Sequence, residues 1–496
     1  MLENLLRRKP VDQAVPDAEH GGSLKRTLGP VDLTALGIGA IIGAGIFSST
    51  GPAAAGDSTH VAAGPALVVS YLLVAVACGF AALCYAELAS MIPIAGSAYT
   101  YAYVSLGELI AWIIGWDLIL EYAVGNVAVA VSWAGYFKSF LAGFGINLPT
   151  WMSTTINNAM DTPGVLESAP HVFGIPIVFN LPAFAIVALL TVILVVGVKE
   201  SARLNSGMVV LKLLLVLAFV GVGGFYVMPA NWHPFAPNGF TGIMSGASLV
   251  FFAYIGFDAV STTAEEAKNP QRDMPIGMIG SLVICTVLYV AVTVVLTGMV
   301  PSPKLGVDDP LAVALQTAGL QKLAGIFSFG TVIAMTAVLL VFQLGQPRIL
   351  MSMSRDGLFF KAFGKVHPRY GTPYVGTIVT GVFVAIPAMF FDLNSIIDFT
   401  NIGTLFAFIL VSAGVIALRR IEPDRERPFR CPGVPFVPIA SIVCCAALMA
   451  YLPAITWKRF VVWLLAGFVI YFFYGRKHSR LAHAAQTPSP STTTAS

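Results

Sequence analysis

The stretch GIGAIIGAGIF, residues 37–47, decides the fold of this chain, because it places four glycines among eleven otherwise apolar residues. The spacing of Gly37, Gly39 and Gly43, with Asp57 twenty residues after the first glycine, has the appearance of a dinucleotide-binding loop. Such a loop needs a soluble strand before it and a helix after it. Residues 37–47 lie instead within a long apolar run, so we reject the nucleotide interpretation and predict a membrane-embedded segment.

The composition is that of a membrane protein. Hydrophobic residues make up 57% of the 496 residues and charged residues 11%, whereas soluble domains carry about 25% charged residues. A chain with so few charges cannot cover its surface in water, so we expect it to lie in a lipid bilayer. The net charge of +3 is small and no basic block is interleaved with aromatic residues, which argues against nucleic acid as a partner.

Neither the cysteines nor the histidines indicate a metal site, a cofactor or an enzyme. The six cysteines lack the spacing of a zinc site or of a disulfide framework. All seven histidines map to loops or tails, and no HExxH motif occurs. We therefore predict a protein that is not an enzyme and has no metal or cofactor, and we expect no proton relay built from histidines.

Twelve apolar segments are long enough to cross a bilayer, which takes roughly 20 residues. They occupy residues 33–55, 64–90, 106–141, 179–198, 204–228, 242–263, 276–300, 323–350, 373–391, 395–418, 434–452 and 457–475. If the N-terminus is cytosolic, the inner segments hold 21 Lys and Arg residues and the outer segments hold 5. The positive-inside rule then predicts a multi-pass protein of the cell (inner) membrane with both termini in the cytosol.

These segments divide the chain into three parts. We predict a cytosolic N-terminal segment (1–28), a single transmembrane domain of twelve helices (29–477) and a disordered cytosolic tail (478–496), because the tail is polar and of low complexity.

Two interpretations of the glycines in residues 37–47 remain open. They let helices pack closely through small residues, or they mark a break in the first span, since unwound backbone in a membrane occurs only where it lines a cavity or is buried in protein. A break usually has a counterpart in an inverted repeat. The sixth span provides one, since it reads FFAYIGFDAVS at residues 251–261, with Gly256 and Asp258 in its middle.

The directions of the interrupted helices predict a ligand. The second half of span one begins near Ala44–Ile46 with free amides and a positive dipole end, which suits a carboxylate. Its first half ends near Ile41 and the first half of span six ends near Phe252–Ile255, and both ends leave free carbonyls that suit an ammonium group. Donors for an anion beside acceptors for a cation match an amino-acid zwitterion.

Five motifs in this chain are similar to those of a known family. They are GIGAIIGAGIF (37–47), FFAYIGFDAVSTTAEEAKNPQRDMPIG (251–277), RILMSMSRDG (348–357), VHPRYGTP (366–373) and ERPFRCPGVPFVP (426–438). With them the chain resembles the bacterial members of the cationic amino acid transporter family, in the amino acid–polyamine–organocation superfamily. The resemblance covers about residues 25–475. It implies an all-α LeuT-like fold with two inverted repeats of five helices, helices 1 and 6 discontinuous, and two extra helices.

The resemblance also assigns a substrate site. It implies that the substrate carboxylate lies on the amides of Gly43, Ala44 and Gly45. It further implies that the α-amine lies on the carbonyls of Ile41, Phe252, Ala253 and Ile255. Where members of the family can have Thr in the first motif, this chain has Ala44, so a hydroxyl contact is lost while the amide remains.

Ionisable residues within predicted spans are candidates for function. Lys212, in span five, either snorkels to the cytosolic surface or faces the bundle and replaces the sodium ion of related transporters. The resemblance supports the second interpretation, because proton-coupled relatives carry a lysine there.

Carboxyl groups are the other intramembrane candidates. Asp258 either caps the second half of span six, contacts a cationic substrate or carries a proton. Asp117 and Glu121 lie four residues apart on one face of span three, as structural groups or as secondary site residues, and Glu121 is the deeper of the two. Three further acids, Glu87, Glu265 and Glu266, lie near the cytosolic side, where they could join an inner gate.

These observations predict a permease that works by alternating access and couples amino-acid uptake to protons. An exchanger or uniporter of the same fold and a non-transporting amino-acid sensor remain alternatives. The identity of the amino acid, and whether the protein is a monomer or binds a small membrane partner, stay open.

Overall fold

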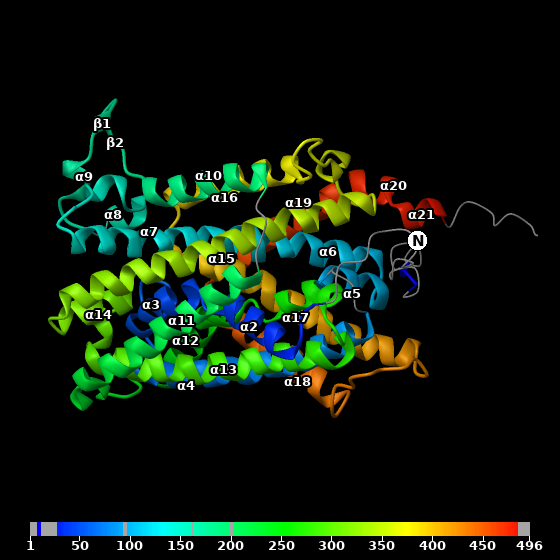
Figure 1. Ribbon diagram of the computed structural model, residues 1–496, viewed down its shortest axis with the longest axis horizontal. Coiled ribbons are helices and arrows are strands. Elements are labelled where there is room, and N and C mark those ends of the chain that lie inside the picture. Colours follow the sequence, from blue (N-terminus) through cyan, green and yellow to red (C-terminus); the bar gives the residue numbers. More distant parts are fainter. Residues whose placement is uncertain (1–6, 11–26, 93–96, 161, 198–201, 485–496) are drawn as a thin grey trace, which may run out of the picture.

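The protein is an elongated bundle of helices that run along its longest axis (Figure 1). A computed structural model describes residues 7–10, 27–92, 97–160, 162–197 and 202–484. Among these residues, nine helices are long and apolar enough to cross a membrane, and three shorter apolar helices occupy the remaining predicted spans. The predicted fold class is therefore confirmed, and so are the positions of the spans.

The first five spans form one set of helices. They are α2 (Pro30–Ile41), η1 (Gly45–Ser49) and α3 (Thr50–Ala55); η2 (Gly64–Ala66) and α4 (Leu67–Met91); α6 (Glu108–Ile119), η3 (Leu120–Val124) and α7 (Gly125–Gly143); α10 (Leu181–Val196); and α11 (Ala202–Gly223) followed by η5 (Gly224–Tyr226).

The second five spans and the two extra ones follow. They are α12 (Gly239–Val250), η7 (Phe251–Tyr254) and η8 (Asp258–Glu266); α13 (Pro270–Met299); α15 (Gln321–Arg355); α16 (Tyr374–Phe390); α17 (Leu393–Ile421); α18 (Phe436–Ala450); and α19 (Ala454–Ile470), η11 (Tyr471–Gly475) and α20 (Arg476–His478).

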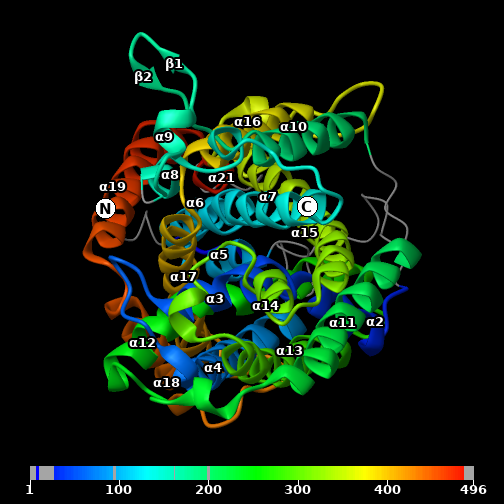
Figure 2. The same ribbon diagram turned by 90° about the vertical axis from the view of Figure 1, so that its left-hand side faces the viewer.

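Short elements connect the spans. They are α5 (Ser97–Ser105), η4 (Thr150–Met152), α8 (Ile156–Met160), α9 (Val165–Ser168), η6 (Pro229–Trp232), η9 (Ser302–Lys304), α14 (Pro310–Thr317), η10 (Lys361–Gly364) and α21 (Arg480–Ala484). The strands β1 (His171–Val172) and β2 (Ile175–Pro176) pair antiparallel, with His171 opposite Pro176. This small hairpin projects from one end of the bundle (Figure 2).

Corresponding helices of the two five-helix sets pack against each other. The second span packs on the seventh through α4 and α13, and the third on the eighth through α7 and α15. The fourth packs on the ninth through α10 and α16, and the broken middles of the first and sixth meet through η1 and η7. An inverted repeat folded around a shared axis brings corresponding helices together in this way.

Many large apolar side chains face outward along the spans. On α13, for example, Val283 and Val287 are exposed, and on α11 Val210, Leu214 and Leu217 are exposed. Such a surface would be unfavourable in water but suits hydrocarbon, so these faces are lipid-facing.

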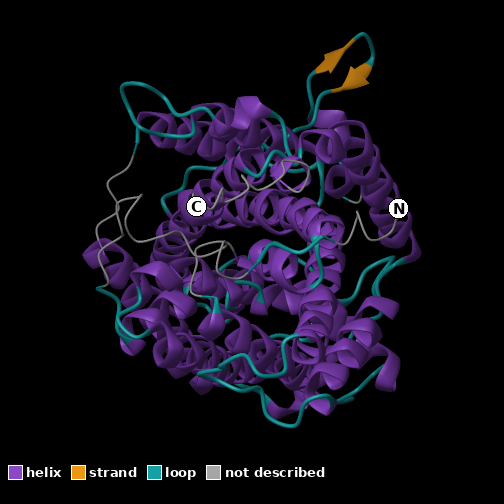
Figure 3. Cartoon of the chain, turned by 90° about the vertical axis from the view of Figure 1, so that its right-hand side faces the viewer, coloured by secondary structure: helices purple, strands orange, loops and turns teal. Residues whose placement is uncertain are grey.

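Both termini of the described chain lie at one end of the bundle, which we call the terminal end. There Lys9 forms an ion pair with Asp356 at 3.5 Å, and the amide of Arg480 donates to the Asp356 carbonyl at 3.1 Å. Figure 3 views the bundle from this end. A chain that crosses a membrane an even number of times has both termini on the same side, which accounts for this arrangement.

The tail differs from the sequence expectation in part. Disorder was expected from residue 478, yet Arg480–Ala484 forms α21, because Ser479 is buried and its hydroxyl donates to Glu108. Residues 485–496 and most of the 1–28 segment lie outside the described residues.

Candidate functional site

The four glycines of residues 37–47 face four different neighbours. A Cβ added at any of them would crowd an atom of another helix, at distances from 2.2 to 3.3 Å. The neighbours are Ser281 of α13 for Gly37, Val209 of α11 for Gly39, Val338 of α15 for Gly43 and Ala253 of η7 for Gly45. Span one is therefore enclosed on several sides, and close packing through small residues is one of the reasons for the glycines.

The predicted breaks are also present, so both interpretations of the glycines hold. In span one, α2 ends at Ile41, and Ile42 is extended with φ −73° and ψ 99°. In span six, Ile255 is extended and Gly256 has φ +121°, a conformation that L side chains rarely adopt.

The two breaks contact each other through reciprocal glycines. A Cβ on Gly45 would lie 2.2 Å from the Ala253 Cα, and one on Gly256 would lie 2.9 Å from the Ala40 carbonyl carbon. Each glycine thus lets the backbone of the other span approach closely. The unwound segments are buried in protein, as membrane-embedded irregular backbone must be.

The backbone carbonyls at the two breaks converge on one atom. The hydroxyl of Tyr289, on α13, lies 2.9 Å from the Ile41 oxygen and 2.9 Å from the Ala253 oxygen. One hydroxyl has a single proton, so it can donate a full hydrogen bond to only one of these two carbonyls at a time. Sequence reasoning missed Tyr289, because its position in span seven carries no local signal that it reaches the breaks.

The residues assigned to the substrate site lie together and are buried. The solvent-exposed fraction is 6% or less for each of Ile41, Ala44, Phe252, Ala253, Ile255 and Asp258. Gly43 and Gly45 are buried as well. The first turn of the helix that starts at Ala44 leaves amides without intrahelical acceptors, and these amides lie beside the two convergent carbonyls. The arrangement offers donors and acceptors in one enclosed place.

Lys212 faces the bundle and does not snorkel. Its side chain is 2% exposed, and its Nζ donates to the carbonyl oxygen of Gly39 at 2.5 Å. Gly39 lies two residues before the end of α2, and the missing Cβ allows Val209 of α11 to approach. Lys212 therefore ties the fifth span to the first, directly beside the break.

The carboxyl groups of spans three and six separate into two environments. Asp258 accepts from the Gly256 amide at 3.2 Å, which satisfies a donor freed by the break. Glu121 of η3 lies against Asp258 and interacts with Thr404 of α17. Both oxygens of Asp117 are buried without a hydrogen-bond partner in the described chain. Glu121 therefore reaches the site, and Asp117 does not join it.

A charged cluster that sequence reasoning missed lies at the end of the bundle opposite the termini. His60, in the loop after α3, is 4% exposed. Its Nδ1 lies 3.1 Å from Asp57 and its Nε2 lies 3.0 Å from Asp398 of α17. We call His60, Asp57 and Asp398 the His60 cluster. Sequence reasoning placed His60 in a loop with the other histidines and did not predict its ion pairs, although Asp398, an acid inside a predicted span, was a signal.

The protonation of the His60 cluster follows from its geometry. Burial lowers the pKa of His60, but hydrogen bonds and charges from Asp398 and Asp57 outweigh burial and raise it from 6.5 to about 10. Burial raises the pKa of Asp57, and its contacts with His60 and Thr59 bring it well below its ordinary value. A histidinium between two carboxylates thus joins the loop after span one to span ten.

The terminal end has its own ion pairs. Glu87 of α4 accepts from Arg419 at 2.6 and 3.0 Å and lies 3.3 Å from Arg427. Its carboxylate also accepts from the Cys431 amide at 2.7 Å. These contacts connect span two to the end of span ten and to the loop that follows. They close the bundle there.

Comparison with known proteins adds an independent finding. Residues 28–479 match the profile of a family described as amino acid permease. The chain is 49% identical over 482 residues to the branched-chain amino acid permease BcaP of Bacillus subtilis, covering 97% of this chain and 100% of that relative. It is 47% identical over 480 residues to the methylthioribose transporter of the same bacterium, with the same coverage of 97% and 100%. A cationic amino acid transporter 4, vacuolar, of Arabidopsis thaliana is 32% identical over 614 residues, covering 98% of each chain.

Proposed function

The chain belongs to the amino acid permease family, and we propose that it is a proton-coupled symporter that brings amino acids with apolar side chains into the cell. The relatives just described are named as transporters or permeases. Their names differ in substrate, so the substrate of this chain must be argued from its own site.

The convergence of the carbonyls carries the proposal. The Ile41 and Ala253 oxygens both lie 2.9 Å from the Tyr289 hydroxyl, so the two carbonyls are close enough together for a single ammonium beside that hydroxyl to reach both of them. An ammonium has three donors and can also bond the tyrosine oxygen. The helix that begins at Ala44 offers amides to the carboxylate of the same molecule. A sugar thioether has neither charged group, which favours an amino acid.

The surroundings of the site favour an apolar side chain. Phe252 and Ile255 are buried there, with exposures of 6% and 3%. One oxygen of Asp258 accepts from the Gly256 amide, and Glu121 lies against Asp258. A basic side chain would have to compete for these groups. The name of the relative BcaP, a branched-chain amino acid permease, is in keeping with this choice.

Lys212 is our proposed coupling residue. Its ammonium donates to Gly39 next to the break, so protonation would hold span five against span one and keep the site formed. Loss of the proton on the inward-facing side would release this contact together with the substrate. The Glu121–Asp258 pair is the rival proton site, because two adjoining carboxyl groups favour sharing one proton.

We also propose that the terminal end faces the cytosol. The inner segments hold 21 basic residues against 5 in the outer ones if the N-terminus is inside. Reporter fusions after Gly143 and Trp232 should then report outside, and fusions after Arg355 and Arg425 should report inside. The opposite pattern in any one pair would contradict the topology.

Two measurements test the function. A thermal-shift screen of the twenty amino acids should show stabilisation by branched aliphatic ones, since a ligand that binds only the folded state stabilises it by mass action. Uptake of that amino acid into proteoliposomes should then increase with an imposed inward proton gradient. Counterflow without gradient dependence would indicate an exchanger or uniporter, and binding without counterflow would indicate a sensor.

A further inference from the structure

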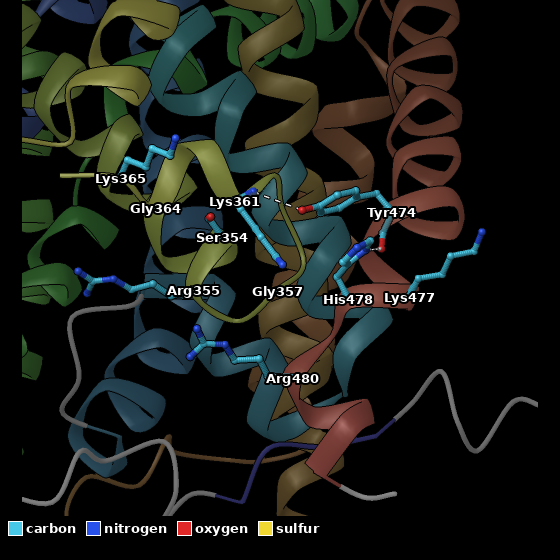
Figure 4. A pocket seen from close by; sticks show the side chains of 10 residues that line it. All are labelled: Ser354, Arg355, Gly357, Lys361, Gly364, Lys365, Tyr474, Lys477, His478 and Arg480. Atoms are coloured by element: carbon cyan, nitrogen blue, oxygen red, sulfur yellow. Dashed lines mark hydrogen bonds between the residues drawn. The ribbon is translucent and has the colours of Figure 1, made fainter. Parts of the chain in front are cut away.

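A basic pocket lies at the terminal end of the bundle, far from the proposed substrate site in the chain and in space. It has a volume of about 750 Å³ and is formed by two segments more than a hundred residues apart, the loop after α15 and the end of the last span (Figure 4). Five cations line it: Arg355, Lys361, Lys365, Lys477 and Arg480. None of the ten lining residues is Asp or Glu.

The cations of the pocket lack partners within the described part of the chain. No ion pair there joins any of the five to a carboxylate, whereas Arg419, Arg425 and Arg427 all have acidic partners. Two acids at this end of the bundle are engaged elsewhere. Asp356 binds Lys9 and the Tyr99 hydroxyl, and Glu108 accepts from Tyr471 and Ser479. Among the described residues, the positive charge of the pocket therefore has no carboxylate partner.

The walls of the pocket are held together by specific contacts. A Cβ on Gly357 would lie 2.1 Å from the His478 oxygen, so the two segments meet at van der Waals distance because residue 357 is glycine. The Lys361 amide donates to the Tyr474 hydroxyl at 3.3 Å, and the Tyr474 ring stacks on His478 at 4.2 Å. In Figure 4 the Lys361 side chain points toward Gly357 and His478. The two segments that line the cavity are thus held together by direct contacts with each other.

The position of the pocket indicates what kind of anion it binds. It lies where the spans Gln321–Arg355 and Ala454–His478 both end, and helices that cross a bilayer end at or beyond the headgroups. Phe473 is 74% exposed and Phe472 is 41% exposed on the same last span, so exposed apolar side chains directly precede Tyr474, which lines the pocket. Basic pockets at the ends of transmembrane helices suit anionic headgroups.

We propose that this pocket binds the phosphate-bearing headgroup of an anionic phospholipid through the basic side chains that line it. Guanidinium groups bind phosphate through two parallel hydrogen bonds. The volume is within the range of pockets that hold drug-sized ligands, so it accommodates the glycerol of the headgroup beside the phosphate. A bound lipid would fasten the end of span eight to the last span.

The test uses the purified full-length protein in detergent, titrated with dioleoyl phosphatidylglycerol, with dioleoyl phosphatidylcholine and with inorganic phosphate. Native mass spectrometry gives the affinity and thermal unfolding gives the stabilisation. We expect saturable binding of phosphatidylglycerol, a rise in Tm that added salt weakens, and much weaker effects from the other two.

The double variant R355Q/R480Q should weaken phosphatidylglycerol binding roughly 30-fold, because each basic residue near a membrane surface changes binding by about fivefold. Its Tm in phosphatidylcholine should equal that of the wild type, which shows that the fold is intact. Arg369→Gln is the matched control, since Arg369 is at the same end, stacks on Tyr370 and does not line the pocket.

Three results would overturn the proposal. Equal phosphatidylglycerol binding by the double variant and the wild type would exclude the pocket as the site. The same loss of binding in Arg369→Gln would indicate general surface charge. Stabilisation by inorganic phosphate as large as that by phosphatidylglycerol, and lost in the double variant, would assign the pocket to a free anion.

Discussion

Two buried cations hold span one, and they differ in what surrounds them. Lys212 donates to a backbone carbonyl, that of Gly39, and within the described chain it has no ion pair. His60 lies between two carboxylates, those of Asp57 and Asp398. A cation that faces only carbonyls can lose its proton without leaving an unpaired charge behind, whereas one between carboxylates cannot. The comparison indicates that Lys212 is suited to proton coupling, and that His60 is suited to holding the loop after span one against span ten.

The largest effect is expected for Lys212→Ala, which should abolish gradient-driven accumulation. For one proton per substrate, a gradient of one pH unit supports about tenfold accumulation, because a tenfold ratio corresponds to about 1.4 kcal/mol. Without the ammonium we expect uptake to stop at equilibration or to disappear. The measurement is labelled amino-acid uptake into proteoliposomes at several external pH values.

Lys212→Arg sharpens that result, because guanidinium keeps its proton and should not rescue accumulation. Lys304→Ala is the control and should behave as the wild type, because Lys304 is an exposed residue of η9. If Lys212→Ala kept the wild-type pH profile, Lys212 would have no coupling role, and Glu121→Gln and Asp258→Asn would be the next variants to measure.

His60→Gln should lower stability by about 3–5 kcal/mol at neutral pH, because it leaves buried Asp398 without its partner. The sign of the pH dependence follows from the raised pKa. The folded state holds the proton up to about pH 10, and the unfolded state releases it near pH 6.5. The contribution is therefore complete below pH 6.5 and decreases as the pH rises through about 10.

The measurement is thermal unfolding of the wild type and of His60→Gln between pH 6 and pH 10.5. The difference in Tm should be largest at the acidic end and smallest at the alkaline end. A difference that does not change with pH would mean that His60 packs in this cluster as a neutral ring.

Gly39→Ala, which alters the partner of Lys212, should have an intermediate effect on both stability and transport. The added Cβ would lie 2.8 Å from Val209 of α11, and overpacking of this kind costs about 1–3 kcal/mol. Since it pushes α11 away from the Gly39 carbonyl, we expect partial loss of accumulation together with the loss of stability. Gly207→Ala on α11 meets nothing within 4 Å and serves as control, and equal transport by the two variants would argue against the contact.

The smallest effect is expected for Asp57→Asn. The Asp57 side chain is 30% exposed, whereas that of Asp398 is 4% exposed. Solvent screens the ion pair of a partly exposed carboxylate more than that of a buried one, so Asp57→Asn should lower Tm less than Asp398→Asn. Thermal unfolding at pH 7 compares them, and equal losses would mean that both acids share the histidinium charge evenly.

Part of the candidate site could be predicted from the sequence because the signals were local. The hydropathy profile gave the spans, and Gly43 and Gly256 indicated breaks where α2 and η7 do end. The assignment of substrate atoms to Ile41 and Ala253 remains a prediction, although these carbonyls converge. Tyr289 could not be found in this way, because nothing around it in the sequence differs from other tyrosines in apolar runs.

The sequence by itself determined the membrane class, the twelve spans, the family and the places where two of the spans unwind, because apolar run length and glycine content act within one segment. Only the tertiary structure decided which side chains meet: Lys212 with Gly39, Tyr289 with two breaks, and His60 with Asp398 from 338 residues away. These contacts depend on how each helix is rotated and on how deeply it lies in the bundle. Rotation and depth result from packing against several neighbours at once, and no single segment of sequence encodes that.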